Sequence, residues 1–189
     1  MEKNQLAVLF PGIGYHVDKP LLYYSAKLVR ARGCEVIAVQ YPALPSGLRG
    51  NAEKIEQAVQ TALAAAEKQL QAVDWAAYDR VFFLSKSIGT AVAARCAVQH
   101  GIHALQAYFT PIEPALADMD STGIAFHGTA DPWARTEIIT AGCRKIGIPL
   151  YLTENANHSM ETGNVLRDIA ILRQIMEQTE RWIEQSDSD

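Results

Sequence analysis

The chain has 189 residues, of which 49% are hydrophobic and 20% charged, and its formal net charge at pH 7 is −4. These values are typical of a globular chain with one sizeable core, so we expect a single domain over residues 1–189. The mildly negative charge argues against nucleic acid or an anionic membrane surface as a partner.

The first apolar run, residues 6–10, ends at Pro11 and is too short for a signal-peptide core or a membrane span. We therefore predict a cytoplasmic protein. The three cysteines, Cys34, Cys96 and Cys143, are an odd number without the spacing of a metal site, which favours buried free thiols over disulfides.

Six short apolar runs, often rich in β-branched residues, predict strands that are buried on both faces. They are residues 6–10, 36–39, 81–84, 104–109, 124–126 and 150–152. The segments between them have helical periodicity. A first helix should follow Asp18 and end at Gly33, and a second should begin after Asn51 as N-cap.

The last segment carries a long apolar stripe that we interpret as a face docked on the sheet. Its members are Val165, Leu166, Ile169, Leu172, Ile175, Met176, Thr179, Trp182 and Ile183. Alternation of strands and helices along the whole chain predicts an α/β fold, a three-layer sandwich with a mainly parallel sheet and helices on both faces. In such a sheet, function is expected in the loops beyond the carboxyl ends of the strands.

One of these loops, residues 85–89, has the sequence Ser-Lys-Ser-Ile-Gly and leads directly into an alanine-rich helix. A strained strand-turn-helix that exposes a nucleophile needs small residues two positions before and after it, as Ser85 and Gly89 are. Ser87 is therefore the candidate nucleophile. The alternative is that Ser85 and Ser87 only cap the following helix.

Two later loops supply the groups that would activate a serine hydroxyl. Asp131 follows the predicted strand 124–126, and His158 follows the strand 150–152, so the chain order is Ser, Asp, His. Taken alone, Asp131 before Pro132 would be a turn or helix-start residue. Glu113 and Asp118 are the reserve candidates for the acid.

With these motifs the chain resembles the α/β-hydrolases, and among them the compact, lidless, dienelactone-hydrolase-like group. The resemblance extends over nearly the whole length and is most specific at the Ser87 turn, at residues 127–132 and at residues 157–159. It implies the α/β-hydrolase fold with a Ser87–His158–Asp131 triad. Members of that group often carry a cysteine nucleophile, so their own substrate is not implied.

The same resemblance assigns an oxyanion hole to the backbone N–H groups of Ile13 and Ile88. Gly12 and Gly14 would let the first loop approach closely, although they would form a tight turn in either case. The family more often has histidine where Pro11 stands in this chain.

Other residues near these loops have two interpretations each. Gly12, Tyr15 and Trp133 are candidates for substrate binding, although ordinary packing would also explain the two aromatic side chains. Lys86 could tune the local potential or bind an anionic substrate, but a solvated lysine is the favoured interpretation. His127 is interpreted as structural. No spacing of ligand residues suggests a metal site.

The predicted reaction is acyl transfer to water through an acyl-enzyme on Ser87, without a cofactor. The segment 111–123 is only thirteen residues long, too short for a helical cap, so we expect no lid domain and a small ester or thioester as the substrate. The alternatives are a peptidase or amidase on the same triad and a non-catalytic binding protein that retains the fold. Oligomeric state stays open.

Overall fold

The computed structural model describes residues 4–185, so the predicted domain bounds at residues 1–3 and 186–189 lie outside the described residues. Within the described part, six strands form one sheet in the order β2-β1-β3-β4-β5-β6, and every neighbouring pair is parallel. The strands are β1 (Gln5–Phe10), β2 (Glu35–Ala38), β3 (Arg80–Lys86), β4 (Ala104–Phe109), β5 (Ile124–Gly128) and β6 (Leu150–Thr153). The predicted parallel sheet is confirmed.

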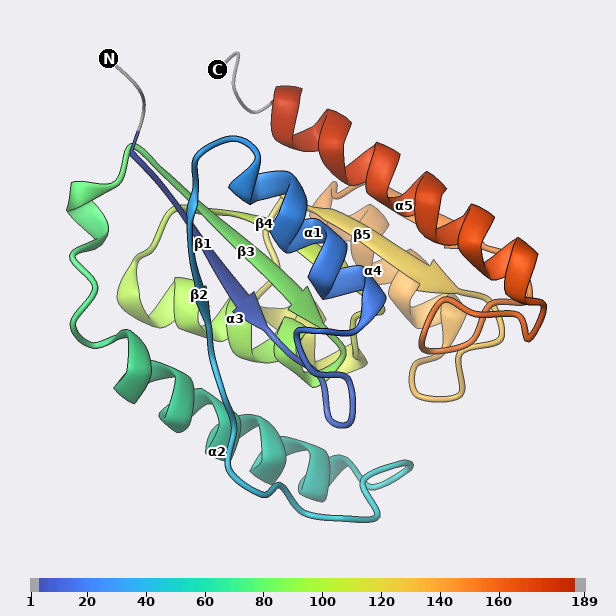
Figure 1. The fold of residues 1–189 in the computed structure, drawn as a ribbon. Coiled ribbons are helices and arrows are strands. Elements are labelled where there is room, and N and C mark those ends of the chain that lie inside the picture. The colour runs from blue at the N-terminus through green and yellow to red at the C-terminus, as the bar shows by residue number, and fades with distance from the viewer. Residues whose placement is uncertain (1–3, 186–189) are drawn as a thin grey trace.

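Helices cover both faces of the sheet, as the alternating pattern predicted. Figure 1 shows α1 (Pro20–Arg30) and α5 (Val165–Gln185) on one side, while α2 (Ala52–Leu70), α3 (Ile88–His100) and α4 (Thr136–Ile146) lie on the other. Side chains of β3 alternate between the two cores: Phe82 and Leu84 pack on the α1/α5 side, and Val81 and Phe83 on the opposite side. The three-layer sandwich is thus confirmed.

The prediction that every strand is buried on both faces is wrong for the two edge strands. In β2 no residue is fully buried, and in β6 Tyr151 and Leu152 are 38% and 48% exposed. An edge strand has a neighbour on one side only, and each of these strands is only four residues long. The central strands β1, β3, β4 and β5 keep the burial that their sequences predicted.

The helix boundaries follow the predicted signals. The Asn51 side chain accepts a hydrogen bond from the Lys54 N–H at 3.0 Å, so the predicted N-cap of α2 is confirmed. The first helix starts at Pro20 and ends at Arg30, and Gly33 follows it with a φ of 80°, a conformation that favours glycine.

The apolar stripe of α5 is only partly a docking face. Its later positions, including Ile175, Thr179 and Ile183, are buried, but Val165, Leu166 and Ile169 are 71%, 80% and 58% exposed. The prediction is wrong for these three residues because the first turns of α5 extend past the carboxyl edge of the sheet (Figure 1). Val165 and Ile169 line a surface cavity there together with loop residues.

Two further sequence predictions concern thiols and membranes. Cys34, Cys96 and Cys143 are free and buried, as expected. Among the helices of residues 4–185, none is both long enough and apolar enough to cross a membrane.

Candidate active site

Ser87 occupies a strained turn between β3 and α3. Its φ of 56° and ψ of −123° are rare for a residue with a side chain and cost on the order of 1–3 kcal/mol. Its side chain makes no capping hydrogen bond to the helix, so the interpretation of Ser87 as a simple N-cap is wrong. Strain at this position is typical of a turn that holds a nucleophile away from the backbone.

Small residues on both sides make this turn possible. A Cβ atom at Gly89 would overlap the backbone carbonyl oxygens of Phe10 and Pro11, so only glycine fits where α3 begins. Ser85 is fully buried, and its hydroxyl donates a hydrogen bond to the Ala107 carbonyl on β4 at 3.1 Å. Serine is therefore accommodated at this small-residue position with its hydroxyl hydrogen-bonded.

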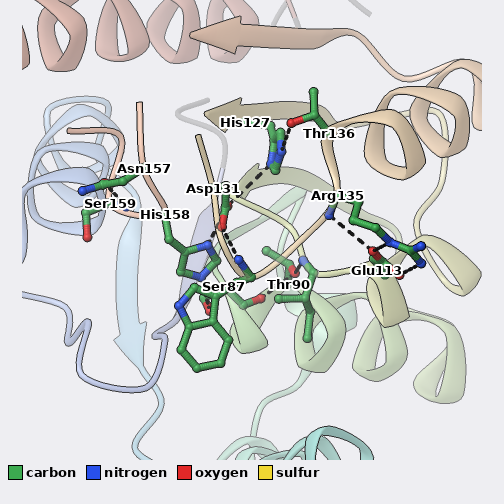
Figure 2. A network of polar contacts seen from close by, with 12 residues as sticks. Ser87, Thr90, Glu113, His127, Asp131, Arg135, Thr136, Asn157, His158 and Ser159 are labelled. Carbon is green, nitrogen blue, oxygen red and sulfur yellow. Dashed lines mark hydrogen bonds and ion pairs between the residues drawn. The ribbon is translucent and has the colours of Figure 1, made fainter. Parts of the chain in front are cut away.

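The structure brings the predicted serine, histidine and aspartate together at the carboxyl edge of the sheet. His158 Nε2 lies 2.7 Å from Ser87 Oγ, and His158 Nδ1 lies 2.6 Å from Asp131 Oδ2 (Figure 2). The other oxygen of Asp131 accepts a hydrogen bond from the Trp133 N–H at 2.8 Å, which fixes the carboxylate. Such a chain can move a proton from a hydroxyl to an imidazole.

The surroundings of the Ser87–His158–Asp131 hydrogen bonds favour a neutral histidine and an ionised aspartate. Burial would raise the pKa of Asp131, whose side chain is fully buried, but hydrogen bonds from His158 and the Trp133 N–H hold it below its usual value. Burial lowers the pKa of His158, opposed by its hydrogen bond to Asp131 and assisted by the positive charge of Lys86. A neutral imidazole is the form that accepts a proton.

A second histidine, His127, also lies close to the Asp131 carboxylate. His127 on β5 is fully buried, with Nδ1 at 3.7 Å from Asp131 Oδ2 and Nε2 at 3.2 Å from the Thr136 hydroxyl (Figure 2). Burial lowers its pKa, although Asp131 opposes the shift. Apart from the i, i+4 spacing of His127 and Asp131, no sequence pattern predicts this pairing.

The reserve acids are engaged elsewhere. Glu113 Oε1 lies 3.0 Å from Arg135 Nε, and Asp118 Oδ2 lies 3.3 Å from Arg95 Nε. Among residues 4–185, no three His, Cys, Asp or Glu side chains are grouped so that they could hold a metal ion.

The loop after β1 folds back against the serine turn. Gly12 and Tyr15 exchange backbone hydrogen bonds of 3.0 and 3.3 Å, which close a tight turn with Gly14 at a φ of 67°. A Cβ atom at Gly12 would lie 3.0 Å from the Ser87 Cβ, so the close approach depends on glycine. Within the described part, the N–H groups of Ile13 and Ile88 donate to no other protein group.

A cavity of about 220 Å³ opens beside Ser87 and His158. Tyr15 and Trp133, both predicted to bind substrate, line it, and the Trp133 ring lies 5.7 Å from the His158 ring between centroids. Gly12 does not line this cavity and instead supports the loop behind it. The other side chains that line the cavity are largely aliphatic: Ile13, Leu48, Ile55, Ile88 and Ile112.

The interpretation of Lys86 as a solvated lysine is wrong. The residue is 1% exposed, and its Nζ lies 4.7 Å from the centroid of the Tyr15 ring. Burial lowers the pKa of Lys86 to about 7, opposed by the charge of Asp131. The alternation of β3 was the signal that could have predicted this burial, because Lys86 shares its face with Phe82 and Leu84.

No protein-family model and no curated protein sequence matches the chain. Its fold, however, is similar to that of many solved structures. A protein of unknown function from Agrobacterium tumefaciens, described as a candidate α/β hydrolase, is 13% identical with a TM-score of 0.65; the match covers 99% of this chain and 87% of the other.

Two further structures extend the likeness. An α/β serine hydrolase without a lid from Xanthomonas campestris is 13% identical with a TM-score of 0.59, covering 96% of this chain and 84% of the other. An esterase from Pyrococcus furiosus is 12% identical with a TM-score of 0.63, covering 95% and 84%. Together with the parallel sheet and the strained serine turn, these likenesses show that the chain has the α/β-hydrolase fold.

Proposed function

We propose that this protein is a serine hydrolase that cleaves small ester or thioester substrates through a covalent acyl-enzyme on Ser87. The observation that carries the proposal is the unbroken hydrogen-bond chain from Ser87 through His158 to Asp131, at the mouth of a cavity. A neutral imidazole with a buried carboxylate behind it is the arrangement that activates a hydroxyl.

In the first half of the reaction, Ser87 Oγ attacks the substrate carbonyl carbon while His158 Nε2 takes the hydroxyl proton. The negative charge that forms on the substrate oxygen is bound by the N–H groups of Ile13 and Ile88. His158 then gives its proton to the leaving alkoxide or thiolate, the bond to that group breaks, and the acyl group remains on Ser87.

In the second half, a water molecule attacks the acyl carbon and gives a proton to His158. Breakdown of the second tetrahedral intermediate releases the carboxylic acid, and the proton returns to Ser87 Oγ. Asp131 stays ionised throughout and stabilises the imidazolium that forms in each half. No cofactor enters the reaction.

The dimensions of the site favour small substrates. The cavity of about 220 Å³ is smaller than a typical drug-sized ligand pocket. The segment between β4 and β5 holds only the short 3-10 helix η2 (Glu113–Ala117), with no helical cap over the cavity.

The test is hydrolysis of matched short-chain esters, thioesters and amides by wild type and by Ser87→Ala. We expect turnover of esters or thioesters that falls by a factor on the order of 10⁶ in the variant. Faster hydrolysis of the amides would replace the proposal by an amidase or peptidase on the same residues. Ligand binding that survives Ser87→Ala, without turnover by wild type, would support a binding protein instead.

A further inference from the structure

Lys86 is a buried cation that the proposed reaction does not use. It stands directly before Ser87, is 1% exposed and lines the same cavity. Within residues 4–185 its ammonium makes no hydrogen bond or ion pair, and its one specific contact is the Tyr15 ring at 4.7 Å. A contact of this kind only partly replaces the lost hydration.

The surroundings of Lys86 would suit an apolar side chain better. Its neighbours on the same face of β3, Phe82 and Leu84, are fully buried in an apolar core. Burying an ammonium without a hydrogen-bond or ion-pair partner is costly. Lys86 therefore carries a cost in stability that no contact in the fold visibly offsets. A residue that carries such a cost beside a reaction site is a candidate for a role in function.

The cavity offers this cation no counter-charge of its own. No acidic side chain lines it in the described part of the chain. Asp131 acts on Lys86 through space, but its oxygens are already bonded to His158 and to the Trp133 N–H. The wall of the cavity is otherwise mainly aliphatic and aromatic, where a charge is weakly screened.

We propose that Lys86 is the anion-binding group of the substrate site, and that the preferred substrate is an ester or thioester whose acyl part carries a carboxylate. Because Lys86 and Ser87 line the same cavity of about 220 Å³, one small substrate would place its carboxylate at Lys86 and its scissile carbonyl at Ser87, as in a monoester of a short dicarboxylic acid. Binding of this carboxylate supplies the partner that the ammonium lacks. The inference rests on the proposed hydrolase function.

The test compares two substrates of the same shape and different charge. Methyl hydrogen glutarate ends in a carboxylate, and methyl glutaramate ends in a neutral amide. We expect wild type to prefer the acid by about 10- to 100-fold in kcat/KM, the size of a hydrogen bond between charged groups. Lys86→Met should bring this ratio to about one, and Lys86→Arg should retain part of it.

Lys145→Met is the matched control, since Lys145 is exposed on α4 and should leave the ratio at the wild-type value. Binding of both esters to Ser87→Ala, measured by calorimetry, gives a readout that does not require turnover. There the acid should bind more tightly than the amide, and adding Lys86→Met should remove the difference.

Equal kcat/KM for the two esters and equal binding to Ser87→Ala would overturn the inference while the hydrolase proposal stands. An equal loss for both esters in Lys86→Met would also overturn it, because Lys86 would then act on the triad and not on the substrate. The proposed function itself fails by a different result, namely no turnover of any ester together with no labelling of Ser87 by a fluorophosphonate.

Discussion

Two groups of carboxylates lie in the loops at the carboxyl edge of the sheet, and they differ in their partners. Asp131, after β5, bonds a histidine that in turn reaches Ser87. Glu113 and Asp118, after β4, bond arginines instead. An arginine stays charged at all relevant pH values and exchanges no proton, whereas a histidine can accept and release one. Position in the fold thus makes an acid available, and its partner decides whether it can support catalysis.

The difference between the two groups of acids is tested most directly by neutralising each acid without changing its shape. Asp131→Asn should lower kcat by about 10⁴-fold, because the amide no longer holds His158 in the tautomer that accepts a proton. Glu113→Gln removes an ion pair at an exposed arginine and should change kcat by less than a few-fold. Steady-state ester hydrolysis measures both. A larger loss in Glu113→Gln than in Asp131→Asn would reverse the assignment.

The next largest expected effect comes from the loss of a backbone N–H group that is proposed to bind the oxyanion. Ile13→Pro removes the N–H proposed to bind the oxyanion and should lower kcat by about 10²- to 10³-fold, less than the loss in Asp131→Asn. The melting temperature of the variant controls for damage to the loop. A folded Ile13→Pro protein with wild-type kcat would show that this N–H does not act on the reaction.

A third prediction concerns the stability cost of the cation beside the triad. The folded pKa of Lys86, about 7, lies below its usual value of 10.5. As the pH falls from 10.5 to 7, Lys86 therefore binds a proton in the unfolded chain but not in the folded chain. The free energy of unfolding consequently decreases over that pH range. Lys86→Met removes a penalty on the order of a few kcal/mol at pH 7.

Thermal unfolding checks this: the melting temperature of Lys86→Met should exceed that of wild type by several degrees at pH 7. The difference should shrink as the pH approaches 10.5. A variant that is less stable than wild type at pH 7 would mean that an unrecognised partner stabilises the ammonium.

The smallest expected effect is in the dependence of kcat/KM on pH. Here the histidine partner of Asp131 differs again from the arginine partners of Glu113 and Asp118. His158 must be neutral to act as base, and its pKa lies below the usual 6.5, so kcat/KM for the neutral ester should fall only below about pH 6.5. The arginines beside Glu113 and Asp118 do not titrate in this range. An acid limb above pH 7 would contradict the environment described for His158.

Much of the fold and the meeting of three side chains could be predicted from the sequence, for a physical reason. Parallel strands end at the same edge, so residues after β3, β5 and β6 are brought together by topology alone. Ser87 follows β3 directly, Asp131 lies in the loop after β5, and His158 lies in the loop after β6. Their catalytic roles remain a prediction.

Features that depend on side-chain surroundings were harder to predict. The general preference of lysine for solvent predicts an exposed Lys86, whereas the alternation of β3 places it inside. Leu166 and Ile169 continue the apolar period of α5, but a helix can extend past the sheet on which it packs. The approach of His127 to Asp131 depends on the path of a loop, which local sequence does not determine.

The most direct test of the central claim is labelling with a fluorophosphonate, which reacts with activated serine hydroxyls, followed by mass spectrometry of the modified peptide. We predict that the label maps to Ser87 and is lost in Ser87→Ala and in His158→Ala, while Glu113→Gln is labelled like wild type. No labelling of folded wild type, or labelling of another residue that persists in Ser87→Ala, would contradict the account.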